Sequence, residues 1–119
     1  MLPSENEGRL EKRKHAARRS TRLSLEIPVV ITSLDPACAF HKECKTVFVN
    51  AHGCAVIVRE RIEDETPVML TLVSTGASKK GRVVLTVPLL ESVSWLLGVE
   101  FDSPENFWEV ENPPGDWRA

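Results

Sequence analysis

Alternation of apolar and polar residues constrains the fold of this 119-residue chain more than any other feature. Apolar residues occupy every second position from Leu23 to Ile31, and a second alternating run extends from Val93 to Phe101. A period of two places successive side chains on opposite faces of a β-strand, so each run predicts a strand with one buried face. Pro28 lacks an amide donor and falls on the outward side of the first run, which predicts a strand edge or a bulge there.

Four further apolar runs lie between these two and are separated by turn signals. They predict strands at residues 40–49, 54–59, 68–73 and 82–87, with the first two joined as a hairpin through residues 50–53. Closing six short strands on themselves removes exposed sheet edges. Together with a hydrophobic content of 42%, the pattern predicts an all-β fold, a small six-stranded antiparallel β-barrel.

The chain divides into three parts. Residues 1–17 form a basic N-terminal arm, in which Ser4-Glu5-Asn6-Glu7 has the form of a capping box and predicts a short, frayed helix. Residues 18–103 form the barrel domain. Residues 104–119 form a tail with a short helical turn, and we expect Trp108 and Trp117 to pack over one barrel end. The alternative is that one of these indoles stacks on a nucleotide base.

Charge is unevenly distributed, although the formal net charge is only −2. Residues 1–22 carry seven Lys or Arg against three Glu, so the remainder carries eight basic and fourteen acidic residues. A basic segment of this kind is either a solvated tail or an anion-binding arm. The acidic body would repel a long polyanion, which makes nucleic acid an unfavoured partner.

Arg18 and Arg22 stand four positions apart immediately before the first strand. Each guanidinium presents a rigid fork of donors that fits phosphate oxygens and the O6/N7 edge of guanine, which lysine would not match. Two forks in one flexible stretch are suited to clamping a guanine nucleotide. The simpler interpretation is a solvated arm whose arginines make ordinary surface ion pairs.

Together with the turn Asn50-Ala51-His52-Gly53-Cys54-Ala55 and the segment Leu97-Gly98-Val99-Glu100-Phe101, the arginine segment resembles the PilZ domain family. The likeness covers about residues 17–102. It implies a six-stranded barrel that binds cyclic di-GMP through an Arg-x-x-x-Arg segment before the first strand. It further implies an Asp/Asn-x-Ser-x-x-Gly turn between the second and third strands.

Carried over residue by residue, the resemblance makes Arg18, Arg22 and Asn50 ligand-binding residues. His52 stands where the family has serine, and an imidazole retains hydrogen-bonding capacity with much greater bulk. Ala55 stands where the family has the last glycine; its methyl group disfavours a positive φ and takes up space beside a ligand. Arg19 and Gly53 complete the candidate ligand-binding residues.

The function implied by the resemblance is a cyclic di-GMP-binding regulatory module, a second-messenger receptor or adaptor in a bacterial signalling pathway. In this interpretation the arm folds over the barrel mouth when ligand arrives. The alternative is a degenerate PilZ-like module that has lost the nucleotide and binds a protein effector instead. A homodimer is a further candidate assembly.

Other classes of function fit the sequence less well. Cys38, His41, Cys44, His52 and Cys54 suggest zinc, but Cys44 and His41 would point to opposite faces of one strand and no Cys-x-x-Cys pair exists. We expect no metal site and no cofactor other than the nucleotide ligand. No phosphate-binding glycine loop or serine elbow is present, so we expect no catalytic residues and no enzyme.

The sequence also carries expectations about location. No apolar stretch approaches the length of a membrane span, and the first residues lack the basic-then-apolar order of a secretory signal. Three cysteines, an odd number, are better explained as reduced thiols than as a disulfide framework. We therefore expect a cytoplasmic protein without a membrane partner.

Overall fold

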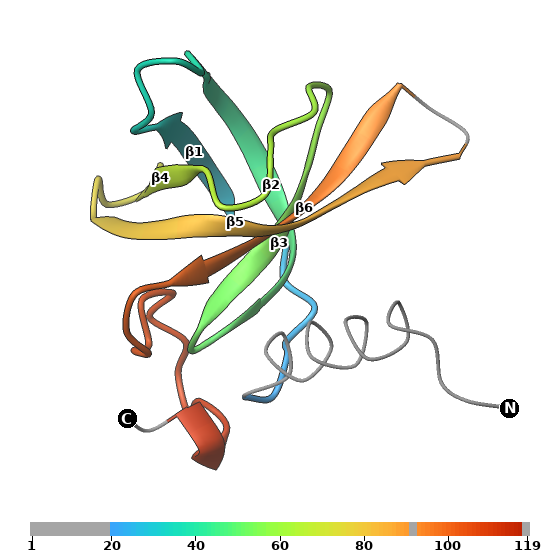
Figure 1. The fold of residues 1–119 in the computed structure, drawn as a ribbon. Helices are drawn as coiled ribbons and strands as arrows, with labels where there is room; N and C mark the ends of the chain where they lie inside the picture. The colour runs from blue at the N-terminus through green and yellow to red at the C-terminus, as the bar shows by residue number, and fades with distance from the viewer. Residues whose placement is uncertain (1–19, 91–92, 118–119) are drawn as a thin grey trace, which may run out of the picture.

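The fold of the chain is a closed antiparallel β-barrel, as predicted (Figure 1). The computed structural model describes residues 20–90 and 93–117. Within these residues, the strands follow the neighbour order β1-β2-β3-β6-β5-β4, and β4 pairs back with β1 to close the barrel. Their bounds are β1 Pro28–Ser33, β2 His41–Asn50, β3 Gly53–Val58, β4 Pro67–Leu72, β5 Ser78–Leu89 and β6 Ser94–Phe101.

The first strand differs from its prediction. The alternating run was expected to be one strand from Leu23 to Ile31, but β1 begins only at Pro28. Residues 23–27 instead run beside β2, where Leu23 forms an isolated bridge with Val49 and the carbonyl of Ile27 accepts the amide of Thr46. Pro28 is suited to the first position of a strand, because its missing donor interrupts no ladder there. The apolar alternation therefore predicted correctly which of these residues are buried, but it did not predict which strand they lie beside.

The fifth strand is longer than expected. Residues 74–81 were predicted as a turn, yet β5 begins at Ser78 and its first residues pair with β4, as in Thr71↔Ser78 and Met69↔Lys80. The first residues of β5 are polar and half-exposed, so they lack the apolar alternation that marks a buried strand. The β2–β3 hairpin was predicted correctly and turns at residues 51–52.

The barrel is filled by the inward-facing residues of all six strands. The completely buried members include Val29, Ile31, Val49, Val56, Val68, Leu70, Val83 and Leu97. At the end of the barrel that holds the β2–β3 turn, Phe101, Phe107 and Trp108 pack in mutual contact, with ring centroids 5.2–5.8 Å apart. The aromatic tail residues thus belong to the same core as the strands.

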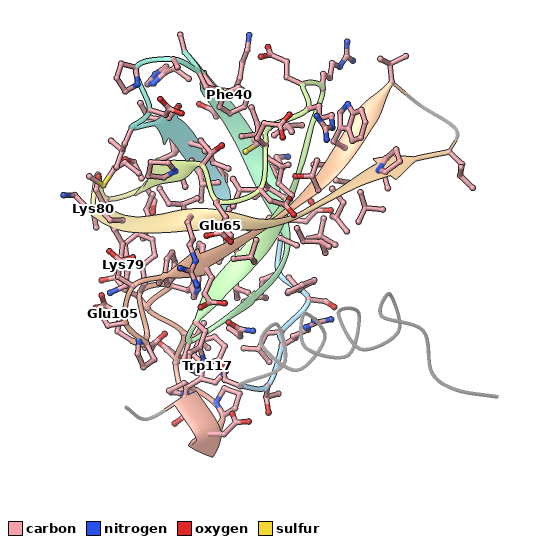
Figure 2. All side chains as sticks on the ribbon, in the orientation of Figure 1. Phe40, Glu65, Lys79, Lys80, Glu105 and Trp117 are labelled. Atoms are coloured by element: carbon pink, nitrogen blue, oxygen red, sulfur yellow. The ribbon has the colours of Figure 1, made fainter. Side chains whose placement is uncertain are left out.

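The two ends of the described chain meet at this same end of the barrel. Figure 1 shows the segment after residue 20, in blue, beside the C-terminal 3-10 turn η1 Gly115–Trp117, in red. Figure 2 shows Trp117, the last residue of η1, at this end of the barrel. Within the described residues, no helix has the length and apolar character that crossing a membrane would require.

Candidate functional site

The β2–β3 turn is held in one conformation by its own side chains and by its neighbours. The amide of His52 donates to Asn50 Oδ1 at 2.8 Å, which closes an Asx-type turn. The carbonyl of His52 accepts the amide of Phe101 at 2.6 Å, and the carbonyl of Ala51 accepts the amide of Glu105 at 3.0 Å. The turn is therefore fixed to the end of β6 and to the tail.

Asn50 occupies a more constrained position than an ordinary hairpin residue. It is 3% exposed, and its backbone carbonyl accepts the indole N–H of Trp108 at 2.9 Å. Its backbone is not in the left-handed region, so the turn does not use asparagine for that conformation. The indole of Trp108 packs in the core, and the hydrogen bond to Asn50 gives its N–H group a partner there.

Gly53 is required by the packing of the strands. A Cβ built at this position would lie 1.8 Å from the carbonyl oxygen of Val99 on the neighbouring strand β6. This distance is far inside van der Waals contact, and the opposing atom is backbone. Only glycine allows β3 and β6 to approach at the Gly53↔Glu100 pair.

Ser20 joins the arginine segment to the turn. Its hydroxyl oxygen accepts the amide of Ala51 at 3.1 Å and lies 3.0 Å from Nδ1 of His52. Ser20 is 3% exposed, so this contact is shielded from solvent. The two halves of the candidate motif, some thirty residues apart in the sequence, thus meet through a single buried hydroxyl group.

Arg22 is placed over β2. Its guanidinium carbon lies 4.3 Å from the centroid of the Phe48 ring, a cation–π arrangement. The next residue, Leu23, exchanges two backbone hydrogen bonds with Val49, at 2.8 and 2.9 Å. Arg18 and Arg19 lie outside the described residues.

Ala55 lies within β3, opposite Phe48 on one side and Gly98 on the other. It is 2% exposed, and its φ is not in the left-handed region. The expectation that alanine strains a left-handed backbone at this position therefore does not apply to this structure. The second part of the expectation, that the methyl group of Ala55 takes up space beside a ligand, is unaffected.

Cys44 and Cys54 lie in strands of the barrel, and Cys38 lies in the loop between β1 and β2. Cys54 alternates with Val56 and Val58 toward the core, and burial raises the pKa of its thiol far above the usual range, with Cys44 as a smaller cause. Burial, and to a lesser degree the charge of Glu43, raises the pKa of Cys44 to about 11. Thiols in this state are poor nucleophiles. Among residues 20–90 and 93–117, no three His, Cys, Asp or Glu side chains gather as metal ligands would.

Sequence reasoning did not assign the residues that hold the arginine segment in place. These are Ser20, Thr21, Phe48 and Asp116. Ser20 and Thr21 stand inside the Arg-x-x-x-Arg spacing, which was the only available signal. Their partners are 32 and 95 residues away, and no local pattern specifies such separations.

Comparison with solved structures supports the fold. The chain is similar to K. pneumonia MrkH in its apo state, with a TM-score of 0.51 and 15% sequence identity over 70% of this chain. The match covers 42% of the MrkH chain, so this chain corresponds to less than half of that protein. No protein family profile matches the sequence, and no curated protein matches it. The likeness to MrkH is therefore one of fold.

Proposed function

We propose that this chain is a cyclic di-GMP-binding regulatory module. The observation that carries the proposal is the contact of Ser20 with Ala51 and His52, which holds residues 20–22 of the arginine segment beside the β2–β3 turn. The resemblance of both segments to the PilZ family supports the choice of ligand. The closed six-stranded barrel supports it as well.

Binding in this proposal divides the ligand between two surfaces. Arg18 and Arg22, with Arg19 beside them, hold phosphate oxygens and guanine edges, because guanidinium forks match both. Asn50 and His52 contact a base from the turn, and Gly53 allows the turn to lie close to β6. Residues 20–23 are already attached to the barrel, so these four residues need no folding step when ligand arrives.

The test is calorimetric titration of the chain with cyclic di-GMP. Each charge-assisted hydrogen bond contributes about 1.5–3 kcal/mol, so Arg22→Ala should weaken binding at least about tenfold. The matched control is Arg59→Ala, which removes the same charge from an exposed position at the other end of β3. Binding that is equal in the unmodified chain and in Arg22→Ala would defeat the assignment.

A second candidate is a protein-interaction module that keeps the barrel and does not bind nucleotide. The observation that favours it is the contact between His52 Nδ1 and Ser20, because one ring nitrogen of the proposed base contact is occupied within the chain. Under this candidate the unmodified chain takes up no cyclic di-GMP in the same titration. The two functions are thus separated by one measurement.

A further inference from the structure

The C-terminal turn η1 holds the residue that precedes Arg22. The amide and the hydroxyl of Thr21 both donate to Asp116 Oδ2, at 2.9 and 2.8 Å. The carbonyl of Thr21 accepts the indole N–H of Trp117 at 2.6 Å. Three polar groups of one residue are therefore bound to a turn that lies 95 residues further along the chain.

The turn itself is anchored in the core, which makes it a firm support. Trp117 is 3% exposed and belongs to the hydrophobic core, and its amide donates to the carbonyl of Pro114 at 3.0 Å. Asp116 stands on this fixed backbone with its carboxylate toward Thr21. Hydrogen bonds to a carboxylate are shorter and stronger than those between neutral groups.

The contacts of Thr21 complete a continuous series along the arginine segment. Ser20 is bound to the β2–β3 turn, Thr21 to η1, and Leu23 to Val49. Arg22 stands between two of these attachment points, and its guanidinium carbon lies 4.3 Å from the centroid of the Phe48 ring. A side chain whose backbone is already ordered loses less conformational entropy when it binds a ligand.

We propose that Asp116 and Trp117 are positioning residues that set the affinity of the Arg22 site for an anionic nucleotide. The inference rests on the proposed function and names a part of the chain, the C-terminal turn, that lies outside residues 17–102. Asp116 acts through Thr21 and not by touching the ligand. An acidic residue here strengthens the binding of an anion only because it orders the arginine, which is the opposite of its direct electrostatic effect.

Because ordering of Arg22 and direct electrostatic repulsion change the affinity in opposite directions, the affinity of Asp116→Ala for cyclic di-GMP distinguishes them. Positioning predicts binding about five- to tenfold weaker, whereas simple removal of a negative charge predicts equal or tighter binding. Asp116→Asn keeps an oxygen acceptor for Thr21 and should remain within about threefold of the unmodified chain. Glu111→Ala, which removes an exposed carboxylate from the same tail, is the matched control and should not weaken binding.

Amide hydrogen exchange of the ligand-free protein supplies the second measurement. Asp116→Ala should speed exchange at Thr21 and Leu23 and leave the core amide of Leu97 unchanged, which separates local release from global destabilisation. Unchanged exchange at Thr21 and Leu23 would overturn the inference. So would equal affinity of Asp116→Ala and the unmodified chain, with the proposed function intact. No binding by the unmodified chain would overturn the proposed function, and the positioning role with it.

Discussion

Replacing Gly53 with alanine tests the packing of the β2–β3 turn against β6. The new Cβ would lie 1.8 Å from the carbonyl oxygen of Val99, 2.9 Å from its carbonyl carbon and 3.1 Å from the Cα of Glu100. All three are backbone atoms, which cannot rotate away as a side chain would. The strands must separate locally, and this movement also strains the hydrogen bond from the amide of Phe101 to His52.

The magnitude follows from these two effects. Overpacking costs about 1–3 kcal/mol, and a lost hydrogen bond costs about 1 kcal/mol. We therefore expect Gly53→Ala to lower the free energy of unfolding by about 3 kcal/mol, with a fall in Tm of roughly 10 °C. Urea denaturation followed by circular dichroism measures the first quantity, and a thermal scan measures the second.

Gly115→Ala is the matched control for this prediction. A Cβ at Gly115 meets no atom within 4 Å, and its φ is not in the left-handed region. The substitution should change the free energy of unfolding by less than about 0.5 kcal/mol, as is usual for exposed positions. If Gly53→Ala were no more destabilising than Gly115→Ala, the close approach of β3 to Val99 would be refuted.

Two further predictions concern Ala55 and Cys44. Ala55→Gly removes a buried methyl group from β3, so it should lower the free energy of unfolding by about 1 kcal/mol. Because the volume of this methyl group is also removed, the binding of cyclic di-GMP should become stronger. Unchanged affinity in calorimetry would show that the methyl group does not hinder the ligand. The pKa of Cys44 is raised from 9.0 to about 11, so the folded state retains its proton where the unfolded state loses it. The contribution of Cys44 to stability should therefore be complete below pH 9 and fall as the pH rises toward 11, and denaturation of Cys44→Ala across this range should show a shallower decline. An identical decline in both proteins would contradict the assigned pKa.

The sequence specified most of the barrel because apolar alternation reports which residues face a core. It located six strands and the β2–β3 hairpin, and it placed Cys54 on the core face beside Val56. It misjudged the beginnings of β1 and β5, where Pro28 limits pairing and where the polar residues from Ser78 pair without being buried. Strand pairing depends on the neighbouring strand, which a local pattern does not contain.

The sequence predicted the two motifs of the candidate site, but it did not predict the contacts that hold residues 20–23 in place. The arginine spacing and the Asn50 turn were visible as motifs, and the structure brings Arg22 and Asn50 to the same end of the barrel. The contacts of Thr21 with Asp116 join residues at opposite ends of the sequence. The pairing of β3 with both β2 and β6 brings the segment that contacts β2 beside the tail that follows β6, so this contact could not be predicted before the fold was known.

The most direct test of the account is a nuclear magnetic resonance titration of the labelled chain with cyclic di-GMP. If the arginine segment and the β2–β3 turn form one ligand site, the largest amide shifts should fall at residues 20–23 and 50–53. The loop at residues 34–40, at the opposite end of β2, should shift little. Shifts that are absent, or that are largest at residues 34–40, would contradict the central claim.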